Sequence, residues 1–172
     1  MDRFRFLFIL AGFAAGCSKQ PPAAQAPSQG AAEPPPAPPP AVAPDSRPVI
    51  AAFGDSLTAG FGVDAGLSYP DFLQKRLDGA GYRYRVVNAG ISGDTSSDGV
   101  ARLTSVVSLQ PGIVVLELGG NDGLRGLPLA TTRSNLERII VELRNSGAKI
   151  VLAGITLPPN YGKEYIAGIE KI

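Results

Sequence analysis

Four short runs of mainly apolar residues alternate with helical patterns in the second part of the chain. The runs lie at 48–53 (PVIAAF), 83–88 (RYRVVN), 113–118 (IVVLEL) and 149–155 (KIVLAGI). Apolar spacings of three and four residues, with end signals, favour helices at 68–77, from Ser96 or Ser97 to before Pro111, from Leu136 to Gly147, and at 163–172. Near-continuous aliphatic strands separated by helices are typical of a parallel sheet covered on both faces. The pattern therefore predicts a three-layer α/β/α domain with a parallel sheet.

Capping residues support the expected helix boundaries. Ser68 precedes a helix that has Pro70 in its first turn, and Ser96 or Ser97 is a candidate N-cap for the next helix. Gly147 stands at the C′ position of the third helix, where left-handed backbone favours glycine. We expect an active site at the carboxyl ends of the strands, because open α/β sheets bind their ligands at that edge.

The first seventeen residues have the pattern of an export signal. Two arginines precede an apolar stretch at 6–15, which is too short to span a bilayer as a helix. Residues 14–17 (AAGC) resemble a bacterial lipobox, although Ala14 stands where such boxes usually carry leucine. The resemblance predicts a lipid anchor at Cys17, and Ser18 then favours the outer membrane of a Gram-negative bacterium. An ordinary cleavable signal with an incidental cysteine is the alternative.

Residues 18–48 have a different composition from the rest of the chain. They hold eleven of the 16 prolines, and Val42 is their one branched aliphatic residue. Such a segment buries too little apolar surface to offset its loss of conformational entropy. We expect a disordered or polyproline-like linker that tethers a folded domain at 49–172 to the membrane.

Composition excludes several classes of function. The chain has 172 residues, 16 Lys and Arg against 15 Asp and Glu, and a formal net charge of +1, which argues against sequence-independent binding to nucleic acid. One cysteine excludes a disulfide framework and Cys-based zinc sites. The chain contains no histidine, so it lacks the side chain that most often acts as a general base near neutral pH.

Three loops rich in small and polar residues follow predicted strands. They are Gly54–Leu57 (GDSL), Ile91–Thr95 (ISGDT) and Gly119–Asp122 (GGND). A serine on a tight strand-to-helix turn is a candidate nucleophile, glycine lets a backbone N–H approach an oxyanion, and an asparagine amide can donate a second hydrogen bond. Together the loops indicate acyl-transfer chemistry, although the same residue types also form ordinary turns.

These three motifs, in this order, resemble the SGNH (GDSL) hydrolases, which are serine esterases on a flavodoxin-like sheet. The longer strings GDSLTAGFGV, VVNAGISGDTS and ELGGNDGLRG resemble the exported thioesterase I, lysophospholipase and arylesterase branch. The resemblance implies that Ser56 is the nucleophile and that the backbone N–H groups of Ser56 and Gly93 and the side-chain amide of Asn121 form the oxyanion hole. It implies small-molecule acyl esters as the substrate class, namely lysophospholipids, acyl thioesters or simple aryl esters, and no metal or organic cofactor.

Four acidic residues lie in or beside these motifs. We expect Asp55 and Asp122 to pin their loops as structural carboxylates. Glu117, inside an apolar strand, is either a paired buried group or an outward-facing strand end. Asp94 or Asp122 could replace a missing base in principle, but their spacing supports neither one.

The family's Asp-x-x-His motif, which supplies the general base near the C-terminus, is missing from this sequence. We expect the chain to be cut short, with the domain 49–172 incomplete, and Ser56 therefore to be inactive as given. The alternatives are a non-catalytic, surface-tethered binding module and, for the complete enzyme, a carbohydrate O-acetylesterase of the same superfamily. A nucleotide-binding flavodoxin-like domain lacks support, because no phosphate-binding glycine motif follows the first strand.

Overall fold

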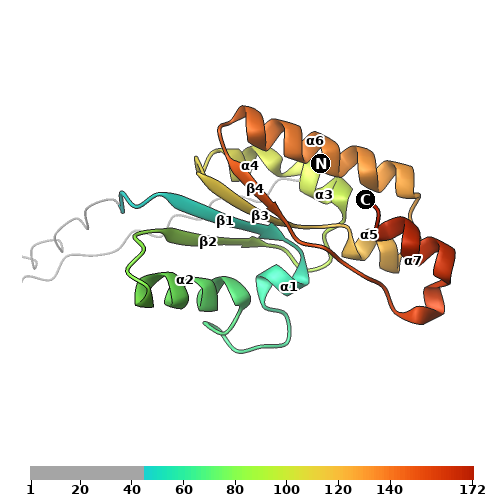
Figure 1. Ribbon diagram of the computed structural model, residues 1–172, viewed down its shortest axis with the longest axis horizontal. Helices are drawn as coiled ribbons and strands as arrows, with labels where there is room; N and C mark the ends of the chain where they lie inside the picture. Colours follow the sequence, from blue (N-terminus) through green and yellow to red (C-terminus); the bar gives the residue numbers. More distant parts are fainter. Residues whose placement is uncertain (1–44) are drawn as a thin grey trace, which may run out of the picture. The chain divides into compact units, whose positions relative to one another are not determined.

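The sheet consists of four parallel strands in the order β2-β1-β3-β4. The computed structural model describes residues 45–172 (Figure 1). The strands are β1 (Val49–Gly54), β2 (Arg85–Gly90), β3 (Ile113–Glu117) and β4 (Lys149–Leu152). Gly54 at the end of β1 pairs with Gly90 on one side and with Glu117 on the other. This register brings the carboxyl ends of the three strands to one edge of the sheet.

Helices cover both faces of the sheet. In Figure 1, α1 and α2 lie on one side, and α3, α4 and α6 lie on the other. The helices are α1 (Ser56–Ala59), α2 (Tyr69–Gly79), α3 (Ser96–Ala101), α4 (Leu103–Val107), α5 (Gly120–Leu124), α6 (Leu129–Asn145) and α7 (Lys163–Ile169), with a 3₁₀ turn η1 (Pro159–Tyr161). The predicted three-layer α/β/α fold with a parallel sheet is confirmed.

The main core lies between the sheet and the layer formed by α3, α4 and α6. Its largest fully buried apolar side chains are Phe53, Leu103, Leu116, Ile139 and Leu143. Each such side chain contributes roughly 1.5–3 kcal/mol by leaving water. The predicted apolar stripe of the helix that ends before Gly147 faces this core, and Gly147 has the expected positive φ of 93°.

Several predicted boundaries differ from the structure. The second strand is Arg85–Gly90 rather than 83–88, and the helix expected from Ser96 or Ser97 to before Pro111 is divided into α3 and α4. Two further differences have a physical reason. The N-cap of α3 is Thr95, not Ser96 or Ser97, because the Thr95 side chain accepts a hydrogen bond from the backbone N–H of Asp98 and the Asp98 carboxylate accepts one from Thr95. The fourth strand ends at Leu152 rather than at Ile155, since its partner β3 ends at Glu117 and the chain turns away at Gly119.

Several predictions concern residues outside the described part of the chain. The export signal 1–17 and the lipidation site Cys17 lie there, as does the linker 18–48 except for its last four residues. Within 45–172, no helix has the length and apolar character required to cross a membrane.

Candidate active site

One amide side chain joins the three predicted loops. The Nδ2 atom of Asn121, in the second position of α5, donates to Asp55 Oδ2 at 3.0 Å and to the backbone carbonyl of Asp94 at 2.9 Å. Ser56 and Asn121 line one cavity of about 290 Å³, with an apolar wall that includes Leu157. Gly93 does not line this cavity, but its neighbour Asp94 is bonded to Asn121. The parallel sheet thus brings the predicted residues to one edge.

The candidate nucleophile lies on a tight turn from β1 into α1. The Asp55 carboxylate accepts a hydrogen bond from the backbone N–H of Leu57 at 3.0 Å and caps α1. The Ser56 hydroxyl is half-buried and lies 3.5 Å from Asp55 Oδ1. Because Ser56 is the first residue of α1, its backbone N–H has no partner inside that helix. The turn therefore presents a hydroxyl and a backbone donor from the same residue.

Glu117 anchors this turn from the end of β3. Its Oε2 atom accepts hydrogen bonds from the Asp55 backbone N–H at 3.3 Å and from the Thr58 hydroxyl at 2.9 Å. Glu117 is 6% exposed, so it is the paired, buried group of the two alternatives and not an outward-facing strand end. Burial, followed by the nearby charge of Asp55, raises the pKa of Glu117 above its ordinary value.

Close packing beneath the turn requires glycine at the end of β1. A Cβ atom on Gly54 would lie 2.0 Å from Thr58 Oγ1 and 2.6 Å from Glu117 Oε2. Contacts this short leave no room for any side chain. The first residue of the GDSL motif is therefore explained by the approach of Thr58 and Glu117.

Two arginines hold the loop that contains Gly93. Arg102 pairs with the Asp94 carboxylate at 2.5 Å and also donates to the carbonyls of Gly54 and Ala89, at 2.9 and 2.7 Å. Arg125 donates to the carbonyl of Gly93 at 2.8 Å, and Gly93 itself has a φ of 88°. Sequence analysis gave neither arginine a role, although Arg125 lies in the string ELGGNDGLRG, because each bonds a segment distant in the sequence.

Asp122 sits beneath Asn121 and is 1% exposed. Its carboxylate accepts hydrogen bonds from the backbone N–H of Ser96 at 2.7 Å and from the hydroxyls of Ser96 and Thr132 at 2.5 and 3.2 Å. These contacts fit the structural role expected for it. They also occupy both of its oxygens, as the ion pair with Arg102 occupies Asp94.

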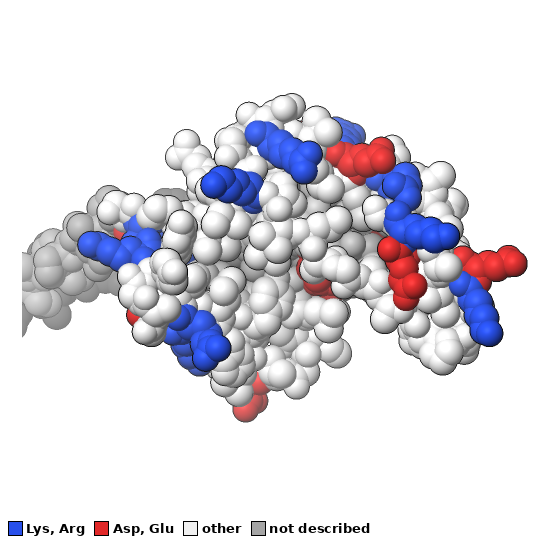
Figure 2. Space-filling model, in the orientation of Figure 1, with Lys and Arg blue, Asp and Glu red and all other residues white. Residues whose placement is uncertain are grey.

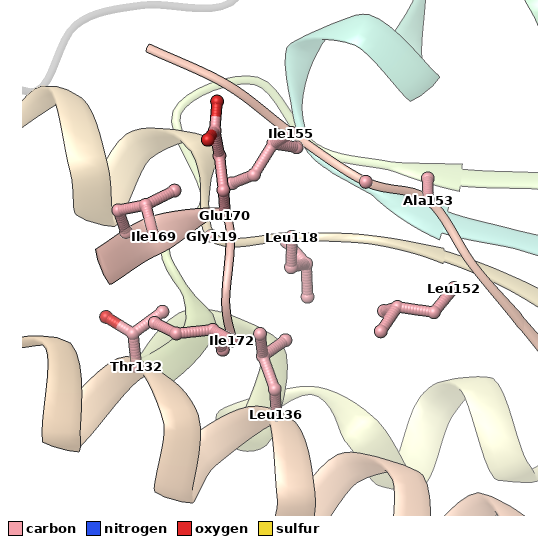
Figure 3. A pocket seen from close by; sticks show the side chains of 11 residues that line it. Leu118, Gly119, Thr132, Leu136, Leu152, Ala153, Ile155, Ile169, Glu170 and Ile172 are labelled. Carbon is pink, nitrogen blue, oxygen red and sulfur yellow. The ribbon is translucent and has the colours of Figure 1, made fainter. Parts of the chain in front are cut away.

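Other features of the described residues lie apart from this site. An apolar pocket of about 180 Å³ lies between the end of β4, α6 and α7, where Leu118, Leu136 and Ile172 lie close together (Figure 3). Figure 2 shows that charged side chains gather over α6 and α7, while the middle of that face, crossed by β4, is almost uncharged. Among residues 45–172, no group of three or more Asp, Glu, Cys or His residues has a geometry suited to holding a metal ion.

Comparisons with known proteins match this arrangement. The chain is 50% identical over 120 residues to Esterase TesA of Pseudomonas aeruginosa, a match that covers 69% of this chain and 60% of that protein. It is 42% identical over 113 residues to Thioesterase 1/protease 1/lysophospholipase L1 of Escherichia coli K12, covering 65% of this chain and 53% of that protein. The chain thus spans a little more than half the length of these relatives.

Structural comparison gives the same grouping. The crystal structure of AlinE4, a SGNH-hydrolase family esterase, has a TM-score of 0.68 and 45% identity, with 72% of this chain and 67% of that chain covered. The sequence model of the GDSL-like Lipase/Acylhydrolase family matches residues 52–171, which include all three loops of the site. The chain belongs to the GDSL-like lipase/acylhydrolase family.

Proposed function

We propose that this chain carries the nucleophile and the oxyanion hole of a serine hydrolase acting on small carboxylic esters or thioesters. The observation that carries the proposal is the single amide of Asn121, which bonds both to the turn of Ser56 and to the loop of Gly93. The similarity to an esterase and to a thioesterase supports the substrate class.

In the proposed reaction, Ser56 Oγ attacks the acyl carbonyl carbon, and a general base takes the hydroxyl proton. The backbone N–H groups of Ser56 and Gly93 and the Asn121 amide then donate to the oxyanion. Collapse of this tetrahedral intermediate expels the protonated alcohol or thiol and leaves an acyl-serine, which water hydrolyses. No metal or organic cofactor takes part.

Asn121 needs one local change to fill its role. Both of its amide N–H groups donate within the protein, to Asp55 and to the Asp94 carbonyl. Binding of an oxyanion therefore requires Asn121 to exchange or share one of these bonds. Asp55 is 3% exposed and also caps α1, whereas the Asp94 carbonyl lies on the Gly93 loop, whose contact with Arg125 is exposed, so we infer that the bond to Asp94 is the one exchanged.

The general base is the part of the mechanism that these residues do not supply. The sequence contains no histidine, and a serine hydroxyl without a base is a poor nucleophile. We expect the purified 172-residue chain to show no turnover of p-nitrophenyl acetate or of an acyl thioester.

A chimera tests the proposal directly. The chain is extended at its C-terminus by the residues of the P. aeruginosa esterase that follow the matched region, and hydrolysis of short and medium acyl esters, acyl thioesters and acetylated xylan is measured. We expect turnover that Ser56→Ala abolishes and that Asn121→Ala lowers by a factor of about 10² to 10³ in kcat. A folded chimera without Ser56-dependent turnover contradicts the proposal, and activity confined to acetylated sugar favours a carbohydrate O-acetylesterase.

We also propose that the chain is exported and anchored to the outer membrane through Cys17, with residues 18–48 as the tether. The export pattern at 1–17 and the AAGC sequence at 14–17 support this. Metabolic labelling with palmitate in a Gram-negative host tests it: label should enter the wild-type chain and be lost in Cys17→Ser. An unlabelled but exported wild-type chain contradicts the anchor while leaving the export signal intact.

A further inference from the structure

The Glu117 carboxyl group supports the nucleophile turn and has one oxygen without a partner. Oε2 accepts from the Asp55 backbone N–H and the Thr58 hydroxyl, whereas Oε1 is buried and accepts no hydrogen bond from the described residues. An ionised carboxylate has about four acceptor sites, so a charged Glu117 would leave half of its acceptor capacity unsatisfied away from water. A neutral acid lowers that cost, because it carries no charge to be desolvated and presents fewer acceptor sites.

The surroundings of Glu117 contain a second acid and no compensating cation. The ion pairs among residues 45–172 involve neither Glu117 nor Asp55. Asp55 is 3% exposed and is held as an acceptor by the N–H of Leu57 and the amide of Asn121. Two adjacent buried carboxyl groups do not both ionise readily, and Asp55 has the donors that stabilise a charge.

We propose that Glu117 is a positioning residue that holds the Ser56 turn as a neutral carboxylic acid, with Asp55 carrying the single negative charge of the pair. Asp55 supports this state through its charge, because its backbone N–H bonds Glu117 and its carboxylate lies close enough to disfavour a second charge. The catalytic meaning of the inference rests on the proposed function, because the oxyanion forms beside this pair. One negative charge there opposes the developing oxyanion less than two would.

The expected pH dependence follows from the groups that face Glu117. These are Asp55 from the turn after β1 and Tyr69 from α2, whose hydroxyl contacts Thr58 at 3.3 Å. Burial, then the charge of Asp55, raises the pKa of Glu117 above 4.5, so the folded chain binds a proton there that the unfolded chain releases. The stability contributed by this proton is present below the ordinary pKa and is lost as the pH rises through the raised one.

Substitution by glutamine tests the protonation state without removing the hydrogen bonds. Glu117→Gln keeps an acceptor for the Asp55 backbone N–H and the Thr58 hydroxyl, and its side chain carries no charge at any pH. We expect its urea midpoint to equal that of the wild type at about pH 4 and to exceed it increasingly toward about pH 8. The exposed Glu137→Gln on α6 is the matched control, and its difference from the wild type should not grow in the same way.

A second variant and a direct titration complete the test. Glu117→Ala removes the acceptor and should lower the midpoint at both pH values. The ¹³C carboxyl resonance of Glu117 in the full chain should titrate with a midpoint above 4.5. A glutamine variant that is less stable than the wild type across the pH range, or a Glu117 resonance that titrates at or below 4.5, overturns the proposal.

The catalytic consequence is read separately in the chimera. Glu117→Gln should keep kcat within about threefold of the parent, whereas Glu117→Ala should lower it. If the chimera proves inactive, the proposed function fails, but the urea and NMR measurements still decide the state of Glu117. If the chimera is active and Glu117→Gln abolishes its activity, an ionised Glu117 is required and the inference is wrong.

Discussion

The turn after β1 and the edge strand β4 differ most clearly in how well their residues are buried and hydrogen-bonded. Around the turn, buried polar groups such as Asp55 and Glu117 are bonded to partners from other loops. Along β4, Val151 and Leu152 are 54% and 48% exposed, although they are apolar and belong to the same sheet as the fully buried Val114. The structure is therefore densely hydrogen-bonded around this turn and weakly covered along β4.

The difference shows which segments of the chain hold the candidate site in place. The hydrogen bonds that place Ser56, Gly93 and Asn121 come from the loops after β1, β2 and β3, from α1 and α5, and from Arg102 and Arg125 at the C-terminal ends of α3 and α5. None of these bonds involves β4. The geometry of the candidate nucleophile and oxyanion donors thus depends on β1, β2 and β3 and the loops after them, and not on what the β4 edge contacts.

The largest effect is expected at Gly90 of β2, which packs against the segment after the β1 turn with no space for a side chain. A Cβ atom on Gly90 would lie 2.2 Å from the backbone N of Ala59, which no side-chain rotation can relieve. Gly90→Ala should lower the free energy of unfolding by about 3 kcal/mol or more, measured by urea denaturation. The control is Gly79→Ala at the end of α2, where an added Cβ meets nothing within 4 Å and should be neutral or stabilise by up to about 1 kcal/mol. Equal stabilities for the two variants would show that the region around the turn after β1 is not tightly packed.

A smaller loss is expected when one carboxylate is removed from the polar network. Asp122→Ala leaves the buried N–H and hydroxyl of Ser96 without their acceptor, which should cost about 2–3 kcal/mol. The same substitution at the exposed Asp64 should change the free energy of unfolding by less than about 0.5 kcal/mol. Chemical denaturation measures both. A loss below about 0.5 kcal/mol for Asp122→Ala would mean that the network adds little to the order of the site.

The sequence was sufficient to predict the strands and the loops that carry the candidate site. Aliphatic runs identified the strands, and small polar motifs at their ends identified Ser56, Gly93 and Asn121, because parallel strands carry their carboxyl ends to one edge. The roles of those residues stay predictions, but their placement follows from sheet topology. Features that depend on a few neighbouring residues, such as the polar motifs at strand ends, could therefore be predicted from the sequence.

Contacts between distant segments could not be predicted in the same way. Nothing local shows that Arg102 reaches the carbonyl of Gly54, 48 residues away, or that Glu117 points beneath the turn rather than outward. The edge position of β4 was also hidden, because KIVL reads as buried whether one neighbour or two neighbours flank it. Strand order decides exposure there, and a hydrophobic pattern does not encode strand order.

The smallest effect tests the edge itself with a substitution that preserves shape. Valine and threonine have nearly the same volume and both suit strands, but threonine brings a hydroxyl that costs about 1–3 kcal/mol when it is buried without a partner. Val114→Thr should therefore lower the free energy of unfolding by about that amount, whereas Val151→Thr should change it by less than about 0.5 kcal/mol. Urea denaturation of both variants at protein concentrations spanning about two decades also shows whether the edge associates with another copy. A large loss for Val151→Thr that appears at high concentration alone would mean that β4 is covered by a neighbouring copy in solution. The same loss at every concentration would mean that β4 is as enclosed as the centre, and the contrast between the two regions would fail.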